Sequence, residues 1–456
     1  MTAGGTAIDR RRSKAALFLA CCALAGIAPH ALSPLRGLLP AITLALFLGG
    51  YSIRTVWLTR APAPAPGPPV APDDLPSVDV VVAARDEQAV IGRLVERIAE
   101  LRYPPDKRKL WIVDDGSEDR TPERLAELAA RYPWLQVLTR PRDAGGGKSG
   151  ALNLVLEQLQ GRWMLVLDAD ADLQPDVLER LIPFAESGQW AAVQLRKAVV
   201  NSDDNLLTQA QAMEMAFDAV IQEGRLAGGG VTELRGNGQL LRRDAVQTAG
   251  GFNEATVTDD LDLSFRFLLA GLPIGLLWDP PVKEEAVLTL PALWRQRQRW
   301  AEGGLQRFLD YWPGLFSDRL TGAQKLDLAC FFLLQYVLPV MAAADLVGAL
   351  ITRTPPTNWP FSIVALGLSG LAIARGCRRP SEGPALPAMN PFSMGLGIVY
   401  LVHWFVVIPW VTVRMALFPK RLVWAKTLHL GQHDDPQVDE DPGDAEGELA
   451  TEGGPL

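Results

Sequence analysis

Cysteine and histidine are both scarce in this sequence of 456 residues, which contains four of each. No two cysteines stand in a C-x-x-C spacing, which argues against a zinc site built on cysteine pairs and against a disulfide framework. Cys21, Cys22, Cys330 and Cys377 lie within or beside apolar runs instead. The region 76–320 contains no histidine, so catalysis there must rest on carboxylates.

Positive charge is also limited. The chain has 44 Lys and Arg residues and 52 Asp and Glu residues, which gives a net charge of −8 at pH 7. This acidic balance argues against a protein that coats nucleic acid, and we expect no nucleic-acid partner. Hydrophobic residues make up 48% of the chain and gather in long runs near both ends. The sequence is therefore unlike that of a wholly soluble protein.

Two apolar runs near the start of the chain, 15–32 and 37–58, are each about long enough to cross a bilayer. A cleaved signal peptide is an alternative for the first run, because a basic stretch before a short apolar run is its signature too. The second run directly behind it favours two anchors. The basic residues ahead of the first run are Arg10, Arg11, Arg12 and Lys14. The positive-inside rule places them in the cytoplasm, and two crossings return the chain there.

Three more apolar runs follow the central region, at 328–351, 359–374 and 392–418, and the middle one is short. The basic cluster after the chain's fourth run fits a cytoplasmic loop and consists of Arg375, Arg378 and Arg379. A fifth crossing would place the next basic cluster on the opposite side, namely Lys420, Arg421 and Lys426. Either one run does not cross or the last cluster breaks the rule. We expect an integral, multi-pass membrane protein with a cytoplasmic catalytic domain.

The chain is expected to divide into five parts. Residues 61–75 are rich in proline and form a semi-rigid linker, and residues 432–456 form an acidic tail that we expect to be disordered. The full division is an N-terminal pair of transmembrane helices at 1–60, the linker at 61–75, a cytosolic catalytic domain with an interfacial helix at 76–320, C-terminal transmembrane helices at 321–431 and the tail at 432–456.

The central region alternates short apolar runs with segments of helical periodicity. This order predicts an α/β domain with a mostly parallel sheet and helices on both faces. The predicted strands are 78–83, 110–113, 136–138 and 163–167, and the predicted helices are 89–101, 122–130 and 149–158. In open sheets of this kind, ligands bind beyond the carboxyl ends of the strands, and acidic motifs follow three of these strands.

Asp168 and Asp170 stand at the end of strand 163–167, where two carboxylates can turn oxygen atoms toward one hard cation. A D-x-D pattern alone is weak, because turns after strands are often acidic. Two further acidic groups strengthen it, since 114–119 follows another strand and Asp259 and Asp260 begin a predicted helix. Three acidic strand or helix ends in one fold are more than solubility requires.

Four motifs resemble, in order, those of the membrane-associated, inverting family 2 glycosyltransferases with the GT-A fold. They are VDDGSEDRT at 113–121, DADAD at 168–172, TDDLDLSFR at 258–266 and QRQRW at 296–300. The resemblance covers about residues 77–320. It implies a GT-A glycosyltransferase domain inserted between N- and C-terminal transmembrane helices.

By this resemblance, Asp114 and Asp115 contact the uracil or ribose of a UDP-sugar donor, and Ala84 and Glu87 help to frame the base. Lys148 approaches the nucleotide or its phosphates. Lys148 belongs to the stretch GGGKS, which suggests a P-loop fragment, but the spacing G-x-x-x-x-G-K-[ST] fails.

The resemblance also implies a catalytic centre. Asp168, with Asp170, holds a divalent cation, Mg²⁺ or Mn²⁺, on the donor diphosphate and neutralises the leaving group. Asp260 is the general base that deprotonates the acceptor hydroxyl as it attacks the anomeric carbon, and this displacement inverts the configuration. Asp259 replaces the Glu that is commoner in the family, a change that we expect to be harmless.

Gln296, Arg299 and Trp300 form the acceptor and diphosphate end of the site in this comparison, where an Arg fork suits phosphate and a Trp face suits a sugar. Alternatively, the same basic segment is an interfacial helix on anionic lipid. Both roles are compatible, because an amphipathic stretch follows at 304–320. The loop 236–239 resembles an acceptor-side loop of the family, with a simple turn as the alternative.

The motifs define the donor better than the acceptor. Length and layout are most similar to family members that move glucose from UDP-glucose to 1,2-diacylglycerol, which implies a glucosyltransferase of glycolipid biosynthesis, surrounded by membrane lipids. The runner-up is a processive polysaccharide synthase of the cellulose or poly-N-acetylglucosamine type, which needs a transmembrane tunnel and usually more helices. A third alternative is a non-catalytic scaffold with a decayed transferase domain. Such a protein would lack at least one of the motif acids, and all of them are present in this sequence. Polyprenyl-phosphate sugar transferases usually lack Q-x-x-R-W.

Overall fold

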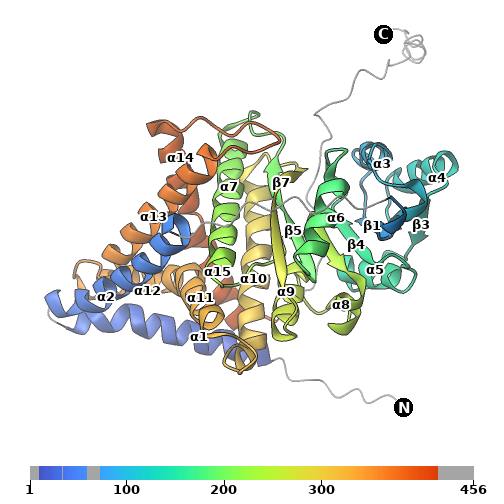
Figure 1. Ribbon diagram of the computed structural model, residues 1–456. Helices are drawn as coiled ribbons and strands as arrows, with labels where there is room; N and C mark the ends of the chain where they lie inside the picture. Colours follow the sequence, from blue (N-terminus) through green and yellow to red (C-terminus); the bar gives the residue numbers. More distant parts are fainter. Residues whose placement is uncertain (1–9, 33, 59–71, 420–456) are drawn as a thin grey trace, which may run out of the picture.

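The computed structural model describes residues 10–32, 34–58 and 72–419. Figure 1 shows a sheet flanked by helices next to a group of long helices that come from both ends of the chain. The α/β class predicted for the central region is confirmed. Most of the proline-rich linker, the basic cluster at 420–426 and the acidic tail lie outside the described residues, so these predictions stay predictions.

A seven-stranded sheet forms the centre of the described α/β part, in the order β3-β2-β1-β4-β6-β5-β7. Neighbouring strands are parallel except at β6, which is antiparallel to both β4 and β5. The four predicted strands are confirmed, and three more complete the sheet. The strands are β1 (Val78–Ala84), β2 (Arg108–Asp114), β3 (Leu135–Thr139), β4 (Trp163–Leu167), β5 (Ala192–Val199), β6 (Gln239–Arg242) and β7 (Ile274–Glu284).

Helices cover both faces of this sheet. Side chains alternate between the two faces along each strand, so one strand packs against helices on both sides. Val80 and Val82 of β1 pack on one face, and Val81 packs on the other. The first face carries α3 (Ile91–Ala99), α4 (Thr121–Arg131) and α6 (Val177–Ser187). The second carries α5 (Gly147–Leu156), α8 (Arg243–Thr248) and α9 (Asp259–Leu269). Burial on both faces explains why β1 is a continuous apolar run.

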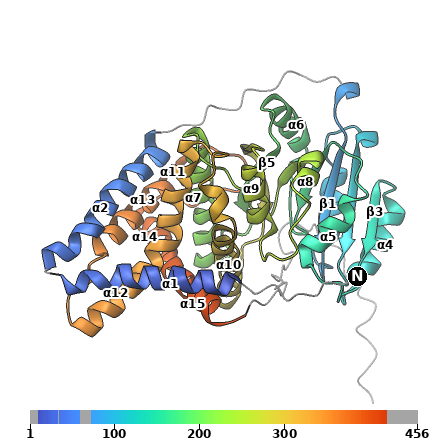
Figure 2. The ribbon, with the colours of Figure 1, turned by 90° about the horizontal axis from the view of Figure 1, so that it is seen from below.

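Two long helices, α7 (Leu206–Ala227) and α10 (Leu290–Leu315), lie between the sheet and the apolar helices (Figure 1, Figure 2). The QRQRW motif and most of the predicted amphipathic stretch 304–320 belong to one helix, α10, which ends at Leu315. Leu305 and Phe308 are buried against α9 and the apolar helices, whereas Trp312 and Phe316 are exposed. The apolar side chains after the motif therefore divide between the protein core and the surface.

The described residues include five helices that are long and apolar enough to cross a membrane, by length and composition. The fourth, which looked short as an apolar run, is a helix of 20 residues. Three of the five contain breaks or π-helical turns. The elements are α1 (Arg10–Ile27) with the turn Ala28–Ala31, α2 (Pro34–Ile53) with the π-helical turn Arg54–Leu58, α11 (Gly322–Phe332) joined by the π-helical turn Leu333–Val337 to α12 (Leu338–Thr352), α13 (Trp359–Arg378), and α14 (Pro391–Leu401) with α15 (Trp404–Leu417). Short 3-10 turns lie at Pro72–Asp74 and Pro105–Lys107.

Candidate active site

A cavity of about 420 Å³ lies where the carboxyl ends of the strands meet α7, α10 and the apolar helices. The structure brings most of the predicted site residues to this cavity, although they come from five separate stretches of sequence. The predicted residues that line it are Glu87, Lys148, Asp168, Asp170, Asp260, Gln296, Arg299 and Trp300. Ala84, Asp114 and Asp115 are not part of its lining.

The acidic motif after β2 builds the loop beside the cavity. The Asp114 carboxylate accepts hydrogen bonds from the Ser117 amide at 3.1 Å and the Ser117 hydroxyl at 2.6 Å, which fixes the turn. Gly116 has φ +70, and a Cβ there would meet the Arg142 backbone at 2.4 Å, so glycine is required. Asp114 is therefore engaged in holding the loop.

Asp115 is buried beside two arginines. Arg140 donates to its carboxylate at 2.7 Å, and Arg85, which lines the cavity, lies 3.6 Å away. Burial raises the pKa of Asp115 and outweighs the two arginines, which act to lower it. Asp115 thus links the cavity wall at Arg85 to the segment that leads to α5.

Lys148, near the start of α5, lies among the acids of the cavity. Its Nζ is 2.5 Å from the Asp168 carboxylate and 3.2 Å from the Gly236 carbonyl oxygen. Burial alone would lower the pKa of Lys148, but Asp168, Asp259 and Asp260 together hold it well above its ordinary value. Lys148 is therefore a fixed positive charge in the cavity.

Asp168 and Asp170 follow β4 and offer the oxygen ligands that Mg²⁺ or Mn²⁺ prefers. Glu285 donates its backbone amide to Asp170 at 3.1 Å, and Asn237 accepts a hydrogen bond from the Asp168 amide at 3.1 Å. The described residues contain no cluster of three or more His, Cys, Asp or Glu side chains suited to a metal. The donor set thus fits a cation that shares its coordination with substrate phosphates.

Asp172 ends the same motif but has other partners than this pair. Lys283 lies 2.8 Å and Arg97 3.2 Å from its carboxylate, and Asp172 does not line the cavity. Its charge is therefore compensated by two cations. Asp172 contributes to the fold rather than to the cavity.

Asp259 and Asp260 form the first turn of α9, where the partial positive charge of the helix N-terminus favours carboxylates. Burial, reinforced by the charge of Asp259, raises the pKa of Asp260 to about 6. Lys148 and Arg235 partly oppose this shift. The Oδ2 atom of Asp259 is buried and has no hydrogen-bond partner among the described residues. Asp260 has the pKa expected of a base that works near neutral pH.

The QRQRW motif on α10 is held by the buried carboxylate of Glu214, which lies outside the four sequence motifs. Glu214 of α7 pairs with Arg297 and accepts hydrogen bonds from Tyr400 and Trp404, each at 2.9 Å. The Arg297 guanidinium lies 4.0 Å from the centre of the Trp300 ring. Arg297, between the predicted residues of the motif, therefore positions the Trp300 ring through a cation–π contact.

Arg299 and Gln296 complete this wall of the cavity. Gln296 accepts a hydrogen bond from Arg297 at 2.7 Å. Arg299 is half-buried and makes no hydrogen bond or ion pair with the other described residues. A guanidinium in this setting remains available to a phosphate, which its planar fork matches.

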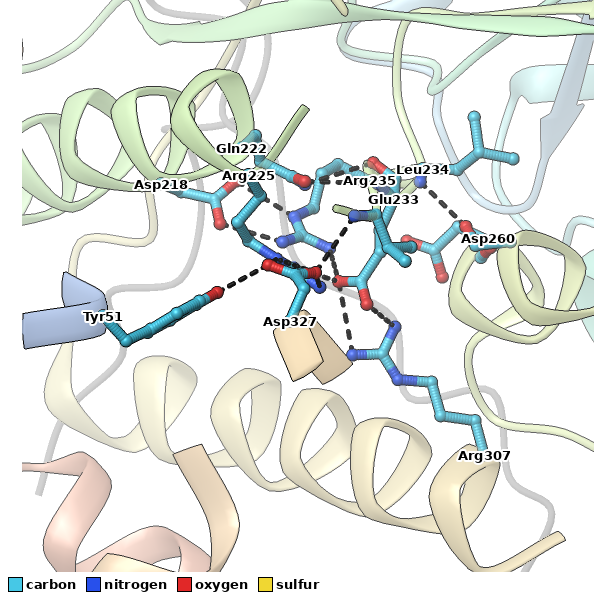
Figure 3. Close-up of polar contacts among 12 residues, drawn as sticks. Tyr51, Asp218, Gln222, Arg225, Glu233, Leu234, Arg235, Asp260, Arg307 and Asp327 are labelled. Atoms are coloured by element: carbon cyan, nitrogen blue, oxygen red, sulfur yellow. Dashed lines mark hydrogen bonds and ion pairs between the residues drawn. The ribbon is translucent and has the colours of Figure 1, made fainter. Parts of the chain in front are cut away.

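A buried network of charges connects the apolar helices to the loop beside Asp260 (Figure 3). Its centre is Glu233, which lies 3.0 Å from Arg307, 3.0 Å from Arg235 and 3.6 Å from Arg225. The network extends to α11 and α2, because Arg225 pairs with Asp327 at 2.9 Å and Tyr51 donates to Asp327 at 2.5 Å. The helices of the membrane part thus hold the loop that faces Asp260.

We expect Glu233→Gln to lower the free energy of unfolding by about 3–5 kcal/mol, because it leaves buried arginines without their shared carboxylate. Burial alone would raise the pKa of Glu233, but Arg307, Arg225 and Arg235 lower it to about 2, so the group is ionised at neutral pH. Thermal unfolding in detergent measures the effect. Asp244→Asn is the control, because Asp244 is 69% exposed in its pair with Arg242 and should change stability little.

Other cavity residues carried little signal in the sequence. Glu284 ends β7 and Glu285 follows it, so the rule that acids at strand ends mark the site could have found them. Arg235 precedes the loop 236–239, and its guanidinium lies 2.9 Å from the Asp218 carboxylate. Glu214 is one of three acids in the long helix α7, with Asp218 and Glu223, and no spacing distinguishes it from a surface residue.

The sequence of this chain is similar to those of known proteins. Residues 76–303 match the family described as glycosyltransferase like family 2. The chain is 46% identical over 392 residues to the beta-monoglucosyldiacylglycerol synthase of Synechocystis sp., an alignment that covers 84% of this chain and 81% of that protein. It is 42% identical over 425 residues to the protein of the same name from Nostoc sp., covering 92% and 90% of the two chains.

A solved structure supports the fold. The mannosyltransferase from Pyrobaculum calidifontis, determined in complex with GDP-Man and Mn²⁺, superposes with a TM-score of 0.56 at 20% identity and covers 88% of this chain and 99% of its own. The predicted GT-A glycosyltransferase fold is confirmed, and candidate membrane helices lie near both ends of the described chain. With the family match over the catalytic region and the relatives that align over most of both chains, this chain belongs to glycosyltransferase family 2.

Proposed function

We propose that the protein transfers glucose from UDP-glucose to the free hydroxyl of 1,2-diacylglycerol, with inversion, and so makes β-monoglucosyldiacylglycerol. One observation carries this proposal: a single cavity is lined by the motif acids at one end and by membrane helices at the other. Such a cavity suits a polar donor beside a lipid acceptor. The names of the relatives support the same product.

The nucleotide belongs on the side of the cavity where β1 and β2 end. Ala84, Glu87 and the loop held by Asp114 frame the uridine, and Asp115 orients this wall through Arg85. These roles rest on the motif match and on the position of the loop beside the cavity.

The diphosphate lies between the acids after β4 and the basic residues of α5 and α10. Asp168 and Asp170 would hold the divalent cation, which supplies positive charge to the departing diphosphate. Lys148 and Arg299 add charge from the protein, and Gln296 and Trp300 border the acceptor. This placement leaves Asp260 at the junction of donor and acceptor.

Asp260 acts as the general base. Its carboxylate takes the proton of the acceptor hydroxyl while the hydroxyl oxygen forms a bond to the anomeric carbon. The bond from that carbon to the diphosphate oxygen breaks, and its electron pair leaves with UDP. Attack opposite the leaving group converts an α-linked donor into a β-linked product.

The protein is proposed to cross the membrane several times, with its catalytic domain in the cytoplasm. The start of α1 contacts the catalytic domain, because Lys14 donates to the Leu309 carbonyl at 2.7 Å and Arg11 to the Ala255 carbonyl at 3.1 Å. The loop after α13 contacts it too, since Arg180 lies 2.8 Å from Glu382. Both basic clusters of the described chain therefore lie on the catalytic side, as the positive-inside rule requires of a cytoplasmic domain.

The last apolar segment, α14–α15, is proposed to lie along the catalytic domain without crossing. It starts close to the loop that holds Glu382, and at its other end Arg414 pairs with Glu302 of α10. Arg12 also donates to the Ala416 carbonyl at 3.3 Å. Four crossings then leave the end of α15 on the cytoplasmic side, where the positive-inside rule expects the basic residues that follow it in the sequence. A green fluorescent protein fused to the C-terminus should fluoresce in cells, and a dark, stably expressed fusion would contradict this topology.

The function is tested by supplying the purified protein with labelled UDP-glucose, Mg²⁺ and diacylglycerol in mixed micelles. One labelled glucolipid of fixed size, with a β-anomeric proton by NMR, is the expected product. Label in long polymer would establish the processive polysaccharide synthase instead. Label in neither fraction, with bound UDP detected by calorimetry, would exclude both acceptors.

The pH dependence should report the state of Asp260. A base works only when it is deprotonated, so kcat/KM should fall tenfold per pH unit below about 6, the pKa to which burial and Asp259 raise the Asp260 carboxyl, and level off above it. The measurement is kcat/KM for diacylglycerol between pH 4.5 and 8 at saturating Mg²⁺.

Asp259→Asn is the matched control for this pH profile. It removes the like charge that raises the pKa of Asp260, so the acidic limb should move to lower pH. A profile that stays in place in this variant would show that another group controls the acidic limb.

A further inference from the structure

The membrane end of the cavity is lined by one face from each of several helices. The segment from α11 to α12 contributes Phe331, Leu334, Gln335, Tyr336, Leu338 and Pro339 to the lining. Four of them share one helical face, namely Phe331, Leu334, Gln335 and Leu338. The facing helices α13 and α7 contribute apolar side chains, including Ala365, Leu366, Leu368, Phe217 and Ile221, and α7 also contributes the carboxylates of Glu214 and Asp218. A surface of this composition suits hydrocarbon chains, and the volume falls within the usual range for ligand sites.

Gln335 is the exception on this face. It lies in the π-helical turn Leu333–Val337, in the middle of a candidate membrane span. π-helical turns occur frequently at functional sites, and polar residues within spans are costly unless they serve a partner. In the described part of the chain, the Gln335 side chain makes no hydrogen bond. Ser369, across the cavity, already donates its hydroxyl to the Ala365 carbonyl at 2.9 Å.

The depth of Gln335 fits the linkage region of a two-chain lipid. Asp327, on the same helix, belongs to the charged network near Asp260, and Gln335 lies about two turns farther from that network. Leu338 lies beyond it, toward the far end of the span. The order along the helix is therefore charge, carboxamide and hydrocarbon.

The chemical groups of diacylglycerol follow the same order as the groups along the helix. Diacylglycerol carries one hydroxyl, two ester carbonyl groups and two acyl chains. If the hydroxyl meets Asp260 and the chains occupy the apolar faces, the ester carbonyls enter a region of low polarity, where an unmet acceptor is costly. The carboxamide of Gln335 offers two N–H donors there.

We propose that Gln335 donates a hydrogen bond to an ester carbonyl of the lipid acceptor and makes the enzyme selective for ester-linked over ether-linked lipid. This inference rests on the proposed transfer to diacylglycerol. It assigns acceptor selectivity to a residue outside the four sequence motifs. Gln335 acts on binding and orientation, and the chemical step stays with Asp260.

The test compares diacylglycerol with the dialkylglycerol of the same chain length, which lacks both carbonyl oxygens. Wild-type protein should use the ester lipid with a kcat/KM roughly three- to tenfold higher, the factor expected for one hydrogen bond. Gln335→Met keeps the length of the side chain and removes the donors. It should lower kcat/KM for the ester lipid by this factor, leave the ether lipid unchanged and bring the ratio close to one.

Ser369→Ala is the matched variant, because it removes a polar group from the same cavity whose hydrogen bond is internal. Its ester-to-ether ratio should equal that of the wild type. A wild-type protein that uses both lipids equally, or an equal loss for both lipids in Gln335→Met, would overturn the inference while transfer to diacylglycerol stands. Glucose transfer to neither lipid would refute the proposed function itself. The wild-type comparison decides the matter even if the Met variant does not fold.

Discussion

Asp260→Asn should lower kcat by about 10²–10⁴-fold, the contribution of a positioned general base, while the protein still binds UDP. Asn has nearly the same shape but cannot accept the proton of the acceptor hydroxyl. The fold around it should persist, because Ser264 donates to the backbone carbonyl of residue 260 at 2.7 Å and this bond does not involve the side chain. Single-turnover transfer and UDP titration by calorimetry measure the two properties separately.

Asp262→Asn is the comparison that separates chemistry from structure on the same helix. The Asp262 carboxylate accepts hydrogen bonds from Asn253 and Tyr311, each at 2.8 Å, and from Arg266 at 2.7 Å. Its replacement should lower the melting temperature and reduce kcat much less than Asp260→Asn does. If both variants lost the same fraction of kcat, or if Asp260→Asn retained full turnover, the role of Asp260 as the base would be wrong.

The strands and helices that the sequence predicted correctly are those whose patterns are local. The apolar run of β1 and the helical spacing of α3 each depend on a few neighbouring residues, and both elements form close to the predicted bounds. The antiparallel insertion of β6 between β4 and β5 depends on contacts between distant segments. No local period encodes such an insertion.

The same distinction applies to the cavity. The acidic motifs were visible because each follows a strand or begins a helix, and parallel strands bring such ends to one edge of the sheet. Glu214 and Arg297 were not predicted as a pair, because 83 positions separate them and only the packing of α7 against α10 joins them. Leu305 and Phe308 looked like part of a lipid-facing stripe, since periodicity shows that a face is apolar and does not show whether protein or lipid covers it.

Asp170→Asn should reduce turnover by about 100-fold or more and raise the concentration of Mg²⁺ or Mn²⁺ needed for half-maximal activity. Loss of a group that merely orients a metal ligand typically costs 10–100-fold, and a ligand itself should cost at least as much. Asn retains an oxygen that can accept the Glu285 amide, so the loop should keep its shape while one negative charge is lost. Titration of activity with each cation, after removal of metal by EDTA, measures the change.

Asp172→Asn supplies the control, because it makes the same chemical change two residues away in a side chain whose partners are Lys283 and Arg97. Its cation requirement should match that of the wild type. If Asp172→Asn raised the requirement as much as Asp170→Asn does, the effect would come from the net charge of the loop and not from coordination. If neither variant changed it, the cation would have to bind through the donor phosphates alone, and the Asp168 loop would serve Lys148, whose ammonium group lies 2.5 Å from Asp168.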